Sequence, residues 1–85
     1  MLTKIDVTQA DIDGGWRGNC MVCPVARALE RVTGRGFSVW LRACYDVKTR
    51  QEYLIPSFVS DRMADYDCGD GMEPFSFEID LYDVD

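Results

Sequence analysis

The chain has 85 residues, 47% of them hydrophobic, and a formal net charge of −6. This length fits one domain, and the hydrophobic content excludes an intrinsically disordered chain. Residues 1–7 form no long apolar run, which argues against a signal peptide or a membrane anchor. We therefore expect a single domain over residues 1–85 in the cytoplasm, with the four cysteines reduced.

The first half of the chain predicts a strand and two helices. Residues 2–7 alternate and predict a short strand, after which Thr8 can cap a helical turn that ends near Asp13. A second helix is predicted over residues 24–33, since its first residue is a proline and Gly34 follows its end. Spacings of three and four predict the buried side of this helix, which consists of Val25, Ala28, Leu29 and Val32.

The second half predicts a hairpin, a helix and a final strand. Residues 37–45 alternate and predict one long strand, followed by a turn at 46–50 and a return strand at 52–55. Pro56 is predicted to begin a helix. The predicted buried side of this helix holds Phe58, Val59, Met63 and Tyr66. Residues 75–81 alternate again, so they predict a half-buried strand.

The resulting order of elements is β-α-β-β-α-β. We expect an α+β fold in which a small, mostly antiparallel sheet carries two helices on one face. A domain of this size buries only about 60–65% of its unfolded surface, so its core is predicted to be thin.

The cysteines are the first candidates for chemistry. Cys20 and Cys23 form a C-x2-C pair before a helix, and with Cys44 and Cys68 they would supply four zinc ligands. The second half of this set lacks its own C-x2-C pair, which weakens the zinc interpretation, and no strand ending in a redox turn precedes Cys20. We expect no metal and no cofactor, and predict that the cysteines pack as small hydrophobic side chains. A structural metal or redox module stays an alternative.

The residue types present do not indicate catalysis. Without histidine, a serine or cysteine nucleophile lacks its usual base. The glycines at 14, 15 and 18 are not followed by the Lys-Ser/Thr of a phosphate-binding loop. A chain of this size also has little room for a deep pocket. The sequence therefore predicts a protein that binds and does not catalyse.

Charge is distributed unevenly along the chain. Residues 1–45 hold six basic and four acidic residues, whereas residues 46–85 hold three basic and eleven acidic residues. No Lys or Arg lies within residues 65–85. On the final strand, Glu78 and Asp80 are two positions apart and should share one outward face. The candidate partner-binding residues are Asp65, Asp67, Asp70, Glu73, Glu78, Asp80, Asp83 and Asp85.

This acidic segment points to a protein partner with a basic surface. Its carboxylates would repel phosphates, so direct binding to nucleic acid is not expected. They can instead compete for a basic nucleic-acid-binding groove and steer association with it. Trp40 or Tyr82 would supply an apolar anchor. The favoured alternative for Trp40 is that the glycine-rich loop that carries Trp16 covers it. We expect a monomer, and the simpler interpretation, that the acids keep a small protein in solution, stays open.

Three motifs run through the chain: V-T-x-x-D-I-x-x-G-x-x-G at residues 7–18, C-P-V-A-x-A-L at 23–29 and P-F-x-F at 74–77. Together they resemble a group of short bacteriophage or prophage proteins of unknown function. Small acidic phage proteins are similar in size and charge to anti-CRISPR inhibitors. The resemblance implies an inhibitor in the host bacterial cell that binds a basic surface of a protein complex, such as a CRISPR surveillance complex, and blocks DNA access. A phage accessory protein that contacts host transcription or assembly machinery is the other alternative.

Overall fold

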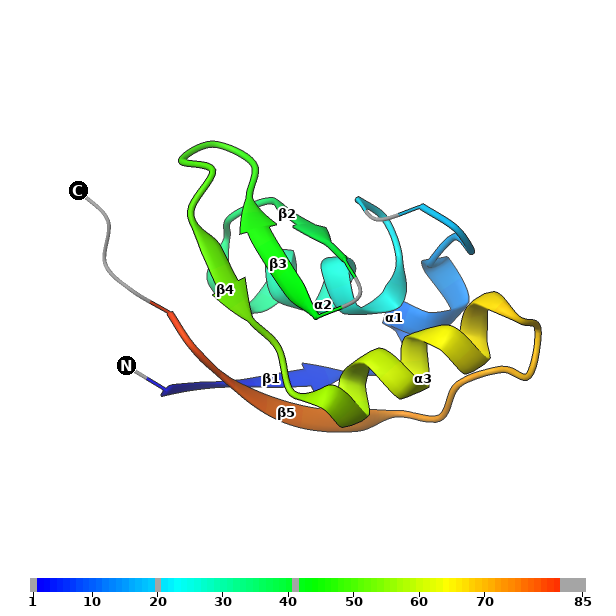
Figure 1. Cartoon of the computed structure of the whole chain (residues 1–85). Helices are drawn as coiled ribbons and strands as arrows, with labels where there is room; N and C mark the ends of the chain where they lie inside the picture. Colours follow the sequence, from blue (N-terminus) through cyan, green and yellow to red (C-terminus); the bar gives the residue numbers. More distant parts are fainter. Residues whose placement is uncertain (1, 20, 41, 82–85) are drawn as a thin grey trace.

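A computed structural model of the chain describes residues 2–19, 21–40 and 42–81. The elements follow the order β1 (Leu2–Val7), α1 (Gln9–Gly14), α2 (Pro24–Thr33), β2 (Phe37–Val39), β3 (Ala43–Asp46), β4 (Glu52–Leu54), α3 (Ser57–Asp67) and β5 (Phe75–Asp80) (Figure 1). The predicted α+β class is confirmed. The predictions made for Cys20, Tyr82, Asp83 and Asp85 lie outside the described residues.

The described strands form two antiparallel sheets, where the sequence predicts one. β1 pairs with β5, and β2, β3 and β4 form a three-stranded meander in that order. The single strand predicted over residues 37–45 is wrong, because the chain reverses between Trp40 and Ala43. There the Trp40 N–H donates to the Ala43 carbonyl at 2.8 Å. The long strand is therefore a tight hairpin, which adds a strand to the predicted order.

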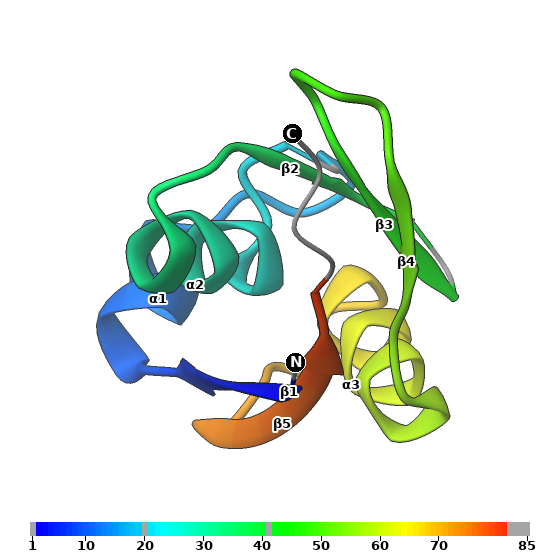
Figure 2. The same cartoon turned by 90° about the vertical axis from the view of Figure 1, so that its left-hand side faces the viewer.

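The helices surround a core that both sheets share. Figure 2 shows α1 and α2 on one side of the fold and α3 on the other, with the β1–β5 pair below them. The sequence predicts both main helices on one face of a single sheet. In the structure, α2 and α3 instead lie on opposite sides of the fold. The core combines residues of both sheets, α2 and α3, among them Ile5, Leu29, Phe37, Tyr53, Val59 and Ile79. Within the described residues, no helix has the length and apolar character needed to cross a membrane.

The N-terminal half folds as its capping residues predict. The Thr8 hydroxyl accepts the Asp11 N–H, and the Asp11 carboxylate accepts the Thr8 N–H, which completes a capping box on α1. The same carboxylate binds Arg31 of α2 at 2.9 Å, and Arg31 also donates to the Asp6 carbonyl in β1. Burial raises the pKa of Asp11, but hydrogen bonds from Arg31 and Thr8 outweigh burial and lower it. One guanidinium therefore ties β1, α1 and α2 together.

The helix α2 has the predicted bounds. Gly34 ends it in the left-handed conformation, with a φ of 73°. Val25, Ala28 and Leu29 are buried as predicted, but Val32 is 38% exposed. The last turn of α2 extends past the core. The apolar spacing therefore predicts one more buried residue, Val32, than the structure buries. In α3, Phe58 of the first turn is exposed, contrary to the prediction, whereas Val59 and Tyr66 are buried and Met63 is half-buried.

Asp46 holds the turn between β3 and β4 from inside the fold. Its carboxylate accepts the N–H groups of Lys48 at 2.8 Å and Thr49 at 3.1 Å, and it binds the Arg35 Nε at 2.8 Å. Arg35 also donates to the Tyr53 hydroxyl at 3.0 Å. Burial raises the pKa of Asp46, but the hydrogen bonds from Lys48, Thr49 and Arg35 outweigh burial and lower it. This network joins the meander to the segment that follows α2.

Candidate functional site: an acidic helix end and an apolar cleft

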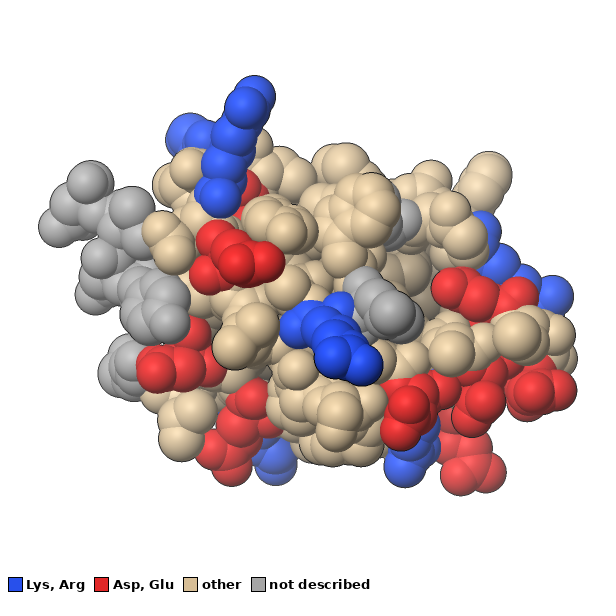
Figure 3. All heavy atoms as spheres, viewed as in Figure 1, with Lys and Arg blue, Asp and Glu red and all other residues tan. Residues whose placement is uncertain are grey.

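The structure divides the predicted acidic residues into two separate groups. The first group, Asp65, Asp67, Asp70 and Glu73, lies at the C-terminal end of α3 and in the turn after it. The second group, Glu78 and Asp80, lies on β5, which runs away from that turn for about 17 Å, at about 3.4 Å per residue. Figure 3 shows acidic side chains toward both ends of this face. The six predicted residues that the structure describes thus form no single continuous surface.

Glu78 and Asp80 share the outward face of β5, as the alternation predicts, because the residues beside them on the strand are buried. Across the sheet, Glu78 is the register partner of Lys4, and Asp80 is the partner of Leu2. The Lys4 Nζ also lies 3.8 Å from an Asp6 carboxylate oxygen. The negative charge of this face is therefore partly compensated.

The first group holds more of the described acidic residues than the second, and we call it the acidic helix end (Asp65, Asp67, Asp70 and Glu73). All four residues are exposed, and Asp65, Asp70 and Glu73 line a shallow hollow together with Arg62. The Arg62 guanidinium itself lies 5.2 Å from the centre of the Phe75 ring. In the described part of the chain, the carboxylates of Asp65, Asp70 and Glu73 form no hydrogen bond or ion pair. Their charge is therefore presented to solvent.

Two of these acids stand where the helix itself disfavours them. The C-terminal end of a helix carries partial negative charge, which favours Lys or Arg in the last turn. The last turn of α3 has no basic residue and contains Asp65 and Asp67. Two arginines of the first half, Arg31 and Arg35, pair instead with the buried carboxylates of Asp11 and Asp46. The helix dipole therefore gives no reason for acidic residues at this end of α3.

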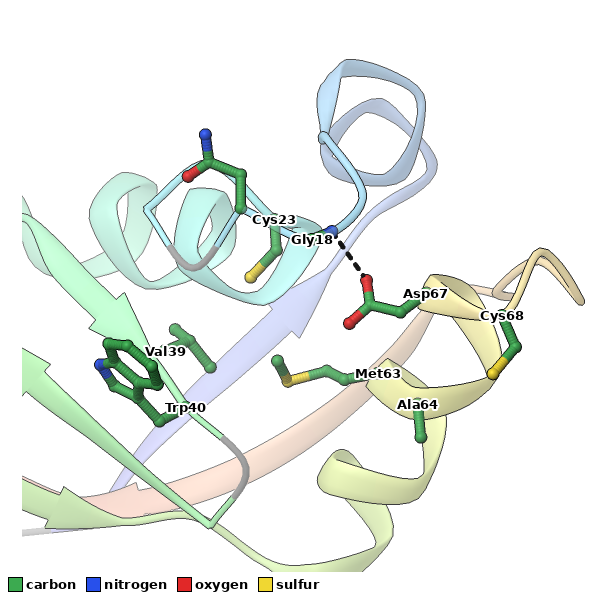
Figure 4. A pocket seen from close by; sticks show the side chains of 9 residues that line it. Gly18, Cys23, Val39, Trp40, Met63, Ala64, Asp67 and Cys68 are labelled. Carbon is green, nitrogen blue, oxygen red and sulfur yellow. Dashed lines mark hydrogen bonds between the residues drawn. The ribbon is translucent and has the colours of Figure 1, made fainter.

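An apolar cleft of about 400 Å³ lies directly beside the acidic helix end (Figure 4). It opens between the glycine-rich loop after α1, the end of β2 and the last turns of α3. Its walls are largely carbon and sulfur, contributed by Cys23, Val39, Trp40, Met63, Ala64 and Cys68. Asp67 places a carboxylate at its edge. The cleft and the acidic helix end therefore share the last turn of α3.

The last turn of α3 also holds the glycine-rich loop in place. The Asp67 carboxylate accepts the Gly18 N–H at 3.1 Å, and Gly18 has a left-handed φ of 67°. The Tyr66 hydroxyl donates to the Gly15 carbonyl at 3.1 Å, while Arg17 lies 5.9 Å from the centre of the Tyr66 ring. Asp67 thus has a structural role, whereas Asp65, Asp70 and Glu73 are free to meet a partner.

Trp40 forms an exposed rim of the cleft. It follows β2 directly, at the chain reversal before β3, and 56% of its surface is exposed. Tryptophan is enriched where proteins bind one another, because it combines a large apolar ring with a polar N–H. The sequence named Trp40 as an anchor, but it gave no indication of the cleft, whose walls come from three distant segments.

The described cysteines have different surroundings. Cys23 caps α2, since its Sγ accepts the Ala26 N–H at 3.4 Å, while Cys68 is exposed at the end of α3. Cys44 is fully buried, and burial raises its pKa to about 12. Among the described residues, no three His, Cys, Asp or Glu side chains are placed to hold a metal ion. Cys20 lies outside these residues, so the proposed C-x2-C pair is described only at Cys23.

Comparison of the chain with known proteins gave no match among protein-family models, curated proteins or solved structures. The resemblance to short phage proteins therefore stays a prediction.

Proposed function

We propose that this protein is a binding protein that docks its acidic helix end against a basic protein surface. The observation that carries the proposal is the gathering of four exposed carboxylates at the end of α3, two of them in the last turn, where the helix dipole disfavours negative charge. Three of them, Asp65, Asp70 and Glu73, have no hydrogen bond or ion pair within the described residues. Such a surface attracts a cationic partner and raises the rate of association.

The acidic helix end is a better binding surface than the outward face of β5. On β5, Glu78 stands across from Lys4, which also approaches Asp6. Two basic residues of the described chain lie near the acidic helix end, and both guanidinium groups lie against aromatic rings, Arg62 over Phe75 and Arg17 over Tyr66. The β5 face therefore contributes at most a secondary contact.

In the form that the resemblance implies, the partner is a nucleic-acid-binding groove of a host defence complex. The protein is then a phage-encoded inhibitor in the host cytoplasm, and its carboxylates occupy positions that DNA phosphates otherwise take. The small size of the chain, its net charge of −6 and its exposed carboxylates support this form. No catalytic step is required, because occupying the groove is enough to exclude DNA.

The test compares two variants with the same net charge. One replaces Asp65, Asp70 and Glu73 by lysine, and the control replaces the exposed residues Asp13, Glu30 and Glu52 by lysine. Each change raises the formal net charge from −6 to zero. Asp67 is kept, because it holds the glycine-rich loop.

A tagged wild-type protein captures its partner from a host lysate, and the affinity of each variant for the purified partner is then measured by calorimetry. We expect the helix-end variant to bind at least about tenfold more weakly, and the control to bind within about threefold of wild type. Circular dichroism melts establish that both variants fold. Unchanged affinity of the helix-end variant, or an equal loss in both variants, would refute a specific role for this surface.

A further inference from the structure

We infer that the apolar cleft receives one large apolar side chain of the partner, so that the recognised element is a basic peptide segment with a single apolar anchor. This inference rests on the proposed function and adds the chemistry of the partner to it. The anchor enters between Trp40 and Met63, and the basic residues that flank it lie along the acidic helix end.

The walls of the cleft suit an aliphatic or aromatic side chain. Val39 forms a buried part of one wall, and the flexible thioether of Met63 faces it from α3 (Figure 4). A methionine can adapt its conformation to side chains of different shape. The volume of about 400 Å³ lies within the range of about 300–1,000 Å³ that small-molecule sites occupy. The cleft therefore has room for one large side chain and is too small for a folded element.

The charge around the cleft selects a cationic segment. Asp67 lies at its edge, Asp65 is two residues before it, and Asp70 is three residues after it in the turn that leaves α3. The basic residue placed at this edge, Arg17, lies over the Tyr66 ring. An apolar side chain that enters the cleft thus brings its neighbours in the peptide against carboxylates. Lysine or arginine next to the anchor is favoured there, and glutamate or aspartate is repelled.

Three synthetic peptides test this inference on the full chain. The first has a central leucine flanked by lysines, the second has alanine in place of the leucine, and the third has glutamates in place of the lysines. Trp16 is replaced by phenylalanine, which leaves Trp40 as the single tryptophan reporter. We expect the leucine–lysine peptide to bind at least about tenfold more tightly than the alanine–lysine peptide, as burial of a leucine side chain implies. We also expect it to change the emission of Trp40, and we expect no binding of the glutamate peptide.

A variant that fills the cleft locates the anchor. Ala64→Trp places an indole in the cleft from α3, and Ala10→Trp adds the same side chain at an exposed position of α1, away from the cleft. We expect Ala64→Trp to abolish the preference for leucine over alanine, and Ala10→Trp to retain it. Melting curves of both variants show whether each one folds, and a smaller Ala64→Phe variant replaces Ala64→Trp if the latter does not.

The outcomes distinguish the contribution of the cleft to peptide binding from that of the acidic helix end. Equal affinity for the leucine–lysine and alanine–lysine peptides overturns the anchor but leaves the proposed function standing, because the lysines still bind. Equal affinity for the lysine and glutamate peptides overturns both. A preference for leucine that persists in the cleft-filled variant, or no binding of either lysine peptide at millimolar concentration, overturns the inference.

Discussion

Replacing Asp46 by asparagine or by alanine separates the two contributions of one buried carboxylate. Asparagine keeps an oxygen that can accept the N–H groups of Lys48 and Thr49, but it removes the negative charge opposite Arg35. Alanine removes both the acceptor and the charge. The loss of unfolding free energy in the asparagine variant therefore measures the contribution of the ion pair with Arg35. The additional loss in the alanine variant measures the contribution of the hydrogen bonds that hold the turn.

The magnitude follows from the burial of each partner. A buried hydrogen bond to a charged group contributes about 1.5–3 kcal/mol. The side chain of Arg35 is 34% exposed and keeps its bond to the Tyr53 hydroxyl, so part of its loss is recovered by water. We expect Asp46→Asn to lower the free energy of unfolding by about 1–2 kcal/mol and Asp46→Ala by about 2–4 kcal/mol. A domain of this size has about 4–13 kcal/mol in total, so the alanine variant should be visibly destabilised.

Urea unfolding followed by circular dichroism measures both losses, and repeating it as a function of pH tests the charge. Because the pKa of Asp46 is lowered in the folded state, its stabilising contribution is fully present above the unfolded pKa of about 3.9. That contribution is lost as the pH falls through the folded-state pKa. Stability of the wild type should therefore fall more steeply in acid than that of Asp46→Asn, with a residual slope from Asp11 in both, since its pKa is also lowered.

Two results would show this reasoning to be wrong. If Asp46→Ala unfolds within about 0.5 kcal/mol of the wild type, the network contributes no more than an ordinary surface residue. If Asp46→Asn loses as much stability as Asp46→Ala, the hydrogen bonds from the Lys48 and Thr49 N–H groups to residue 46 do not stabilise the fold. Parallel acid titrations of the wild type and Asp46→Asn would contradict the lowered pKa.

Three further predictions follow from the fold. Gly34→Ala should cost about 1–2 kcal/mol in urea unfolding, because a residue with a Cβ must adopt the left-handed φ of 73°; an unchanged midpoint would contradict this. Leu29→Ala should cost about 2–5 kcal/mol and Val32→Ala about 0.5 kcal/mol or less, since only the first is fully buried; equal losses would restore the predicted stripe. In pulse alkylation read by peptide mass spectrometry, Cys68 should react in the native protein. Cys44 should react only after unfolding, because burial raises its pKa to about 12, and native labelling of Cys44 would refute its burial.

Local patterns predicted the elements that depend on neighbouring residues. The strand at 2–7 and the helix at 24–33 have the predicted bounds, since alternation, a first-turn proline and Gly34 act within a few positions. The strand predicted over 37–45 failed for a related reason. The reversal between Trp40 and Ala43 contains no glycine, proline or asparagine, so the alternation continues through it without a turn residue.

The candidate site depended on contacts that no local pattern reveals. Alternation correctly placed Glu78 and Asp80 on one outward face. Their separation from the acidic helix end depends on the turn after α3, where Gly69 and Gly71 adopt positive φ values and the chain is redirected into β5. The cleft requires three distant segments to meet. Sequence reasoning therefore named the exposed acids but did not identify which of them form one surface.

The pairing of β1 with β5 makes the two ends of the described chain protect one another. The register partners nearest in sequence, Val7 and Phe75, are 68 positions apart, so this pairing closes the longest loop among the described strand pairs. It is expected to form late in folding. Proteolytic removal of β1 would leave β5 as an unpaired strand with Phe77 and Ile79 uncovered. Such a fragment presents an open hydrophobic edge to its copies, so loss of a few residues at the N-terminus should promote aggregation.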